Sequence, residues 1–404
     1  MERIIMHIDV NNAFLSWSAI DLLNKGYKYD IRNSYAVIGG DESARSGIVL
    51  AKSMPAKKMG IYTSQTLYSA RKQCPVLKVY PPNFSFYSEM SHKLFELISK
   101  YTPDIEVASI DECYLDYTPV RNLYGEPLEF AKKLQKEIYD TLKFTVNIGI
   151  AENKLCAKMA SDFSKPYKIH TLYPEEIASK MWPLPVGDLF GIGKKTAEKL
   201  KALGINTIYS LAHADVSLLQ HYFKNMATVM IDSANGRDDS KVVSEIEEAK
   251  GISNEITLDH DVTTKAELYE HLQFLSEKVG RRIRLNNRYA LVIAIILKDK
   301  YFKRMTRQRK IDNPTNNSDE IFKISKEILN EIEEIKPVRL IGIRLDKLCN
   351  KKTYQVSLFD DVSVKEDNDN LDKVIDVINN KYGRSIVRKA SLINTKEIKR
   401  LEKK

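Results

Sequence analysis

The first 170 residues alternate between apolar runs typical of strands and the three- to four-residue spacing typical of helices. Strands are predicted at residues 4–10 and in "YAVIGG", "GIVLAK" and "FTVNIGIA", with the second and third forming a hairpin around "DESARS". Helices are predicted at residues 13–24 and 128–141, in "NFSFYSEMSHKLFELISKY", and as short basic segments in "PAKKMGI" and "SARKQCP". This order predicts an α+β layer with helices packed on a mostly antiparallel sheet.

The stretch "IEVASIDECYLDY" resembles one half-buried strand with two acids, Asp111 and Glu112, in its middle. Neighbouring residues of a strand point to opposite faces, so at least one carboxylate should face something other than water. Because a buried carboxylate without a partner is costly, the pair indicates a function rather than a role in packing.

Beyond residue 170 the pattern changes to short helices and polar turns, of which "LPVGDLFGIGKKTAEKLKALGI" is the clearest. The charged, helix-poor "NGRDDSKVVSEIEEAKG" indicates a linker. A second α+β unit is then predicted from "ISNEITLDHDV", a helix at residues 265–285, a basic β-rich run, a helix at residues 319–334 and "VRLIGIRLDKL". From about residue 349 the chain is acidic and Asn-rich, with helical periodicity in "LDKVIDVINNKYG".

The net charge of +9 is concentrated in one block of the 404-residue chain. Residues 281–310 contain eleven Lys or Arg and one acid, Asp299, so this block carries +10 and the rest sums to about −1. A basic block can be a solvated face or a tail. Because this one includes the β-rich run "YALVIAIIL", a folded surface that binds a polyanion is favoured.

Four widely spaced cysteines form neither a metal-ligand motif nor a disulfide framework, which is typical of a reducing cytoplasm. The N-terminus begins with a strand-like run rather than a signal peptide. The longest apolar run, residues 290–297, is far shorter than the roughly 20 residues of a membrane helix. We therefore expect a soluble, cytoplasmic protein without membrane contact.

Asp9 ends the first predicted strand, in "MHIDV", and is a third acid in an apolar context. A lone aspartate at such a place often caps a turn. If the strands of Asp9 and of Asp111 and Glu112 are neighbours, however, three carboxylates converge and need cations, and hard oxygen ligands suit Mg²⁺. Such a site suits phosphoryl or nucleotidyl transfer with two metal ions.

Lys165 in "DFSKP" and the lysines of "AKSMPAKK" could neutralise a triphosphate, although each alone is an ordinary surface residue. In "FGIGKKTAEKLKALGI" the glycines Gly191 and Gly193 predict a tight turn whose backbone N–H groups face a phosphate at the next helix N-terminus. Gly-x-Gly turns are common, but this turn, together with the helix that follows it, is typical of a helix–hairpin–helix. Lys194 and Lys195 add positive charge without reading the DNA sequence.

These motifs resemble those of the Y-family translesion DNA polymerases, in the bacterial DNA polymerase IV branch. The resemblance covers "HIDVNNAF", "SIDECYLD", "NIGIAENKLCAKMASDFSKP" and "GIGKKTAEKLKALGI", and more loosely the chain up to "IGIRLDKL". It implies an α+β multidomain, right-hand fold. The expected parts are a palm at residues 1–12 and 79–170, fingers at 13–78, a helical thumb at 171–238, a linker at 239–248, an α+β little finger at 249–348, and a C-terminal tail at 349–404.

The resemblance also implies a role for individual residues. Asp9, Asp111 and Glu112 would be catalytic and, with the Val10 carbonyl, hold two Mg²⁺ ions, for which Mn²⁺ is expected to substitute. Phe14 would exclude ribonucleotides. The expected nucleotide contacts are Phe14, Ile48, Leu50, Met54, Lys57 and Lys165. The expected DNA contacts are Gly191, Gly193, Lys194, Lys195, Arg281, Arg282, Lys303, Arg304 and Arg307.

One departure from the family pattern lies in "SMPAKK", where Met54 and Lys57 replace the usual Tyr and Arg that hold the triphosphate. Lys57 keeps a charge but lacks the bidentate fork of arginine, and Met54 lacks a hydroxyl. This departure from the family pattern therefore puts the nucleotide affinity or the catalytic rate in question.

In the tail, "YQVSLFDD" places Gln355, Leu358 and Phe359 as in the peptide by which bacterial polymerases bind the sliding clamp. A plain tail segment is the alternative for so short a motif.

The sequence thus predicts a monomeric, low-fidelity DNA-directed DNA polymerase acting on primer–template DNA and deoxynucleoside triphosphates. One alternative is a catalytically weak accessory that binds DNA and the clamp. Another is a nucleotide cyclase with a similar palm, which explains the acids but neither the hairpin motif nor the basic block.

Overall fold

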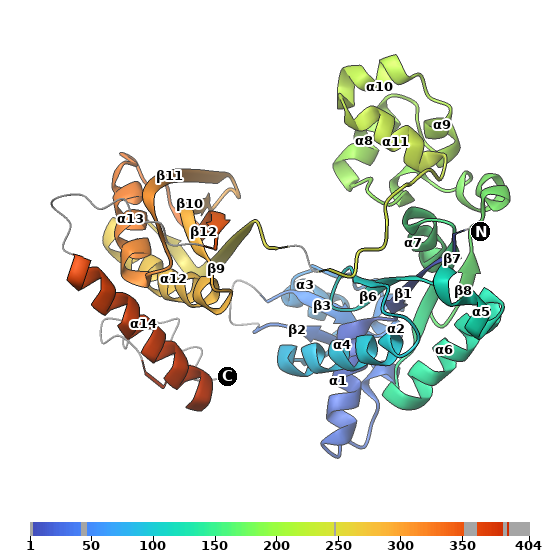
Figure 1. Cartoon of the computed structure of the whole chain (residues 1–404), viewed down its shortest axis with the longest axis horizontal. Coiled ribbons are helices and arrows are strands. Elements are labelled where there is room, and N and C mark those ends of the chain that lie inside the picture. The colour runs from blue at the N-terminus through green and yellow to red at the C-terminus, as the bar shows by residue number, and fades with distance from the viewer. Residues whose placement is uncertain (1–2, 42–46, 246–247, 351–361, 383–385, 388–404) are drawn as a thin grey trace. The chain divides into compact units, whose positions relative to one another are not determined.

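The computed structural model describes residues 3–41, 47–245, 248–350, 362–382 and 386–387 (Figure 1). The chain divides into two compact units. The first contains residues 1–43 and 47–246, and the second is made up mainly of residues 247–404.

The first unit is built around a five-stranded sheet in the order β5-β6-β1-β7-β8. Its strands are β1 (Ile5–Val10), β5 (Ile105–Val107), β6 (Glu112–Asp116), β7 (Val146–Ala151) and β8 (Ile169–Thr171). Neighbouring strands are antiparallel except β7 and β8, as the hydrophobic pattern predicts.

Helices cover both faces of this sheet because successive apolar residues of β1 point to opposite sides. Met6 and Ile8 belong to the core shared with α1 (Ala13–Asn24), α4 (Phe84–Ser99) and α6 (Pro127–Leu142). Ile5 belongs to the core on the other face, together with residues of α7 (Lys154–Asp162). The glycine of β7, Gly149, brings α7 unusually close, since an added Cβ would lie 2.0 Å from the Ala157 carbonyl oxygen.

A smaller three-stranded sheet, in the order β3-β2-β4, forms a separate layer of this unit. Its strands are β2 (Ala36–Gly39), β3 (Val49–Lys52) and β4 (Lys78–Tyr80), and α2 (Met54–Lys58) and α3 (Leu67–Gln73) pack on it. The antiparallel pairing of β2 with β3 confirms the predicted hairpin.

Short helices complete the first unit: α5 (Arg121–Tyr124), α8 (Lys194–Ala202), α9 (Ile208–Ala212), α10 (Val216–Phe223) and α11 (Met226–Ala234). The predicted linker follows them. Between residues 237 and 245 it contains neither helix nor strand, but it is bound to the sheet layer. Asp238 accepts a hydrogen bond from the Leu155 N–H at 3.0 Å, and Glu106 accepts one from the Val243 N–H at 2.9 Å.

The prediction of one continuous strand through "IEVASIDECYLDY" is wrong. The chain forms a tight hairpin, in which β5 pairs with β6 and residues 108–111 make the turn. The backbone N–H groups of Ala108 and Ser109 donate to the Glu112 carbonyl at 3.0 and 3.1 Å. Asp111 therefore lies in the turn, and Glu112 begins β6.

The second unit is a four-stranded antiparallel sheet in the order β11-β10-β12-β9 with two helices on one face. The strands are β9 (Gly251–Val262), β10 (Tyr289–Asp299), β11 (Arg304–Thr315) and β12 (Val338–Cys349). The helices are α12 (Lys265–Leu285), which has its predicted bounds, and α13 (Ser318–Asn330). The predicted end of α13 at residue 334 is wrong by four residues, because acidic side chains (Glu331, Glu333, Glu334) oppose the negative end of a helix.

A further helix, α14 (Val362–Tyr382), is longer than its sequence periodicity predicts and packs on α12. Its contact is polar. The Arg284 guanidinium of α12 lies 2.9 Å from Asp372 and 2.6 Å from Asp376, and all three side chains are largely buried. Within the described part of the chain, no helix is both long and apolar enough to span a membrane.

Candidate functional site

The three predicted acids come together at one end of the five-stranded sheet. Strand β1 pairs with β6 so that Asp9 lies directly opposite Glu112. The hairpin turn places Asp111 beside them, since the Val10 N–H donates to the Asp111 carbonyl at 3.0 Å. The prediction that these two strands are neighbours is thus confirmed.

Each carboxylate has a different environment. Asp9 is buried, and burial raises its pKa although Lys165 opposes this. Asp111 accepts a hydrogen bond from the Ser109 hydroxyl at 2.7 Å. Contact with His7 lowers the pKa of Glu112 to about 2, against the effect of burial and with the help of Lys158.

Two lysines on and just after α7 neutralise this end of the sheet. Lys158 lies 2.6 Å from the Glu112 carboxylate, and Lys165 contacts Asp9 and also Asp162, the latter at 2.8 Å. Burial by itself would lower the pKa of both lysines, but the carboxylates raise it. In the described residues, no three acidic, histidine or cysteine side chains are grouped as metal ligands. Asp9 contacts Lys165 and Glu112 contacts Lys158, whereas Asp111 accepts from the Ser109 hydroxyl.

His7 supports Glu112 from inside the protein. Its ring is fully buried between β1 and α7, with Nδ1 2.8 Å from the Ser161 hydroxyl and Nε2 3.2 Å from the Glu112 carboxylate. Burial lowers the pKa of His7, so the neutral ring is favoured. His7 lies opposite Gly149 in the β1–β7 ladder, on the face against which α7 packs. The sequence analysis missed His7, Lys158 and Ser161, because their roles depend on how closely α7 approaches the sheet.

Phe14, in the first turn of α1, is half-buried and held in a fixed orientation. Its ring stacks on Tyr87 with centroids 4.9 Å apart and meets Phe84 edge-on at 6.1 Å. The chain enters α1 through Asn12, whose left-handed backbone (φ 52°) turns it sharply after Asp9 and Val10. The Phe14 ring, five residues after Asp9, is therefore held in one orientation by its aromatic neighbours.

The other predicted nucleotide contacts lie on the small sheet layer. Ile48 and Leu50 are half-buried at and beside β3, whereas Met54 and Lys57 are exposed on α2. Burial and the positive charge of Lys57 lower the pKa of Lys52, at the end of β3. Lys52 and Lys57 thus form a pair of cations that repel each other in the absence of an anion.

Of the two glycines in the helix–hairpin–helix turn, one has the left-handed backbone conformation that requires glycine. Gly191 has a φ of 89°, which favours glycine, whereas Gly193 is extended and caps the N-terminus of α8. Lys194 and Lys195 are exposed in the first turn of this helix.

The five basic residues predicted to bind DNA in the second unit do not share one face. Arg281 contacts Asn380 of α14, and Arg282 donates to the Ser253 carbonyl at 2.7 Å. Arg304 forms an ion pair with Glu255 at 2.7 Å. The remaining two, Lys303 and Arg307, are exposed. In the ladder with β10, Arg307 lies opposite the core residue Ile295, on the helix-covered side of the sheet.

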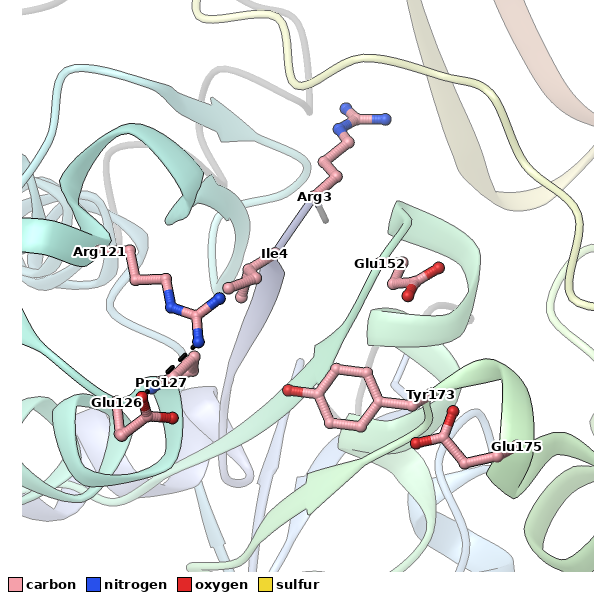
Figure 2. Close-up of a pocket in the computed structure, with 8 residues that line it drawn as sticks. All are labelled: Arg3, Ile4, Arg121, Glu126, Pro127, Glu152, Tyr173 and Glu175. Atoms are coloured by element: carbon pink, nitrogen blue, oxygen red, sulfur yellow. Dashed lines mark ion pairs between the residues drawn. The ribbon is translucent and has the colours of Figure 1, made fainter. Parts of the chain in front are cut away.

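A pocket lies near the other end of β1 from Asp9 (Figure 2). Its lining carries both charges, with one ion pair at 3.6 Å between Arg121 and Glu126. The lining residues are Arg3, Ile4, Arg121, Glu126, Pro127, Glu152, Tyr173 and Glu175. None of the predicted site residues is among them, so this pocket is not the candidate site.

The predicted clamp-binding residues Gln355, Leu358 and Phe359 lie outside the described residues, and their role stays a prediction.

Three comparisons with known proteins agree on a family. Residues 8–162 match the impB/mucB/samB family, residues 249–358 match the C-terminal domain of that family, and residues 174–205 match the IMS family HHH motif. DNA polymerase IV of Clostridium acetobutylicum is 43% identical over 398 residues, covering 98% of this chain and 100% of the relative. DNA polymerase IV 1 of Bacillus subtilis is 34% identical over 402 residues, covering 98% and 95%.

The fold is similar to that of a solved Y-family DNA polymerase chimera. The TM-score is 0.75, and the match covers 86% of this chain and all of the other at 24% sequence identity. This likeness supports the palm, fingers, thumb and little-finger arrangement.

Proposed function

This chain belongs to the impB/mucB/samB family, and from that premise we infer that it is a DNA-directed DNA polymerase that performs translesion synthesis. The observation that carries the inference is the 43% identity to a DNA polymerase IV over nearly the whole chain, combined with the meeting of Asp9, Asp111 and Glu112 at one sheet end. The chain depends on a divalent metal ion, as polymerases of this family do. We further propose that the metal is Mg²⁺, that two ions bind, and that Mn²⁺ can replace them.

The residues at the sheet end have the donor chemistry that such ions prefer, and a bound ion would take the place of the lysine contacts of Asp9 and Glu112. Asp9, Asp111 and Glu112 supply hard oxygen donors, and the Val10 carbonyl is proposed as a fourth. Burial raises the pKa of Asp9, which indicates that a negative charge there is incompletely neutralised by Lys165. When bound, the ions would polarise the primer 3′-hydroxyl and neutralise the leaving pyrophosphate.

The chain's own residues would then position the reactants. Lys165, partly exposed beside Asp9, is proposed to contact the triphosphate, while Lys158 and His7 hold Glu112 from behind. The flat ring of Phe14, fixed by Tyr87, is proposed to clash with a ribose 2′-hydroxyl. Ile48 and Leu50 would cover the nascent base pair.

On α2, Lys57 and the exposed Met54 are proposed to stand where relatives bind the triphosphate, with Lys52 as a second cation. The mutual repulsion of the two lysines would be relieved by a phosphate. This favours a binding mode based on two point charges instead of an arginine fork.

We propose the domain bounds given by the resemblance: palm 1–12 and 79–170, fingers 13–78, thumb 171–238, linker 239–248, little finger 249–348 and tail 349–404. Gly191, Gly193, Lys194 and Lys195 would bind a DNA phosphate. Gln355, Leu358 and Phe359 would bind a sliding clamp, which surface binding of the Leu358→Ala, Phe359→Ala variant to purified clamp tests. The protein is proposed to act as a monomer in the cytoplasm.

Primer extension with Mg²⁺ and all four deoxynucleotides tests the function. Wild-type protein should extend the primer, and Asp9→Ala or Asp111→Ala should lower the rate by about 10³-fold or more with nearly unchanged DNA binding. Asp116→Asn, at the far end of β6, is the matched control and should extend normally. If the wild type binds DNA and clamp without extending primers, the chain is the accessory protein instead. Near wild-type extension by Asp111→Ala would refute the assignment of the acids.

A further inference from the structure

The hairpin turn between β10 and β11 presents two aromatic rings to solvent. Tyr301 and Phe302 are 78% and 61% exposed at the tip of the second unit's sheet. Single exposed aromatic side chains are ordinary on a protein surface, but these two are adjacent in sequence and share one turn.

The turn that carries the rings is firmly built. The Asp299 carboxylate accepts hydrogen bonds from the Tyr301 and Lys303 N–H groups, both at 2.9 Å, and the Lys300 N–H donates to the Pro337 carbonyl at 3.2 Å. Phe302 has a φ of 66°, a conformation that bulky residues rarely adopt. Backbone strain of this kind persists where the surrounding contacts enforce it, and it concentrates at functional sites.

Cations surround the rings. The Lys298 ammonium and the Arg339 guanidinium lie 5.3 and 5.0 Å from the centre of the Phe302 ring, and the Lys300 ammonium lies 5.1 Å from that of Tyr301. The acid within the turn, Asp299, has its carboxylate occupied by backbone N–H groups. We call the segment 298–303 together with Arg339 the aromatic tip. It combines two exposed aromatic side chains with positive charge.

We propose that the aromatic tip binds unpaired bases of single-stranded template DNA by stacking. This combination of aromatic faces and cations is the one by which proteins bind single strands without reading sequence. Duplex DNA would use the cations but offers no free base faces to the rings. The proposal rests on the proposed function in so far as the substrate is DNA, and it adds a contact beyond the duplex.

Fluorescence anisotropy without nucleotides tests the proposal. The probes are a labelled primer–template with a single-stranded overhang of about 10 nucleotides, within the usual range of single-strand sites, and the same duplex without overhang. The variant Tyr301→Ser, Phe302→Asn removes both rings, and asparagine tolerates the left-handed backbone at 302. Its affinity for the overhang probe should fall at least about fivefold, with the duplex affinity unchanged.

Two controls separate stacking from folding. Tyr301→Phe, Phe302→Tyr keeps both rings and should bind like the wild type. Tyr382→Ser removes another exposed tyrosine of the same unit, which also has a lysine beside its ring, and should have no effect. A 2-aminopurine in the overhang should be quenched by the wild type and not by the ring-free variant.

Three results would overturn the proposal. The ring-free variant could bind both probes as tightly as the wild type does, or it could lose the same factor of affinity for both. It could also bind both probes normally and lose only clamp binding, which would assign the tip to a protein partner. The proposed function fails separately, through absence of primer extension by the wild type, and that result leaves the overhang measurement interpretable.

Discussion

Gly149→Ala should damage the candidate site without touching any proposed ligand. A Cβ added at Gly149 would lie 2.0 Å from the Ala157 carbonyl oxygen, 2.4 Å from the Ser161 nitrogen and 3.0 Å from the Ala160 Cβ. The first two are backbone atoms of α7, which cannot rotate away. Because ordinary contacts of a Cβ begin near 3.4 Å, α7 must retreat by more than 1 Å from β7.

The consequences reach Glu112 through α7. The hydrogen bond between Ser161 and His7 is 2.8 Å long and the ion pair between Lys158 and Glu112 is 2.6 Å long. A shift of this size would break the first and weaken the second. Overpacking costs about 1–3 kcal/mol, and each weakened polar contact adds about 1 kcal/mol. We therefore expect a loss of roughly 3–5 kcal/mol in unfolding free energy, and about 10²-fold in rate, since the misplacement is near 1 Å.

Thermal unfolding of the first unit and single-turnover primer extension measure the two effects. Gly193→Ala is the control for stability: its Cβ would meet nothing within 4 Å and its φ of −74° suits any residue, so it should lose no more than the about 1 kcal/mol expected for alanine at a helix N-cap. Wild-type stability and rate in Gly149→Ala would refute the reasoning, since α7 would then have room that the geometry denies it. Lost stability with a normal rate would show that the contacts of α7 to Glu112 do not matter for catalysis.

Three further predictions concern other parts of the molecule. Phe14→Ala should admit ribonucleotides, whereas Phe14→Tyr should still exclude them; an unchanged ratio of ribo- to deoxyribonucleotide incorporation would place the gate elsewhere. The folded-state pKa of His7 lies below its ordinary 6.5, so the unfolded state binds more protons as pH falls below 6.5, and the protein loses stability in that range. Urea unfolding of His7→Gln at several pH values should show a smaller loss of stability. An identical pH profile in the variant and the wild type would contradict this. Arg284→Met removes the cation shared by Asp372 and Asp376 and leaves Asp376 the more distant Arg281, at 4.0 Å, so up to about 3–5 kcal/mol of α14 docking should be lost and α14 should become sensitive to protease. Unchanged proteolysis would mean that these ion pairs do not hold α14.

Local patterns were sufficient for the elements whose residues show a clear period. Helices α1 and α12 have their predicted bounds. The acids themselves were visible in the sequence, whereas the pairing of Asp9 with Glu112 was only a condition of the argument, which the structure meets. The β5–β6 hairpin was missed because its turn residues, Ser109 and Asp111, alternate with apolar Ile110 and so continue the pattern of a strand. Its geometry comes from Ser109 and from backbone contacts to Glu112.

The rest of the site depends on contacts between residues distant in sequence. His7 and Ser161 are 154 positions apart, and nothing in either local pattern indicates that they meet. Their contact requires the close packing of α7 on Gly149, and a glycine within a strand has several possible reasons. A sequence pattern thus identifies the acids but not the groups that hold them in place.

The basic block, residues 281–310, shows that counting charges in the sequence does not tell which of them are neutralised in the fold. Strand β11 was not predicted, because Arg307 and Arg309 interrupt the apolar inward row between Met305 and Ile311. In that row Arg309 binds Glu327 and Glu331 of α13, while in the opposite row Arg304 and Lys310 face away from the helices. Arg284, counted in the same block, serves to bind α14. The block's charge of +10 therefore overstates the charge available to DNA, since part of it is neutralised within the second unit. The exposed Arg307 and Lys310 and the cations of the aromatic tip are among those that remain for a polyanion.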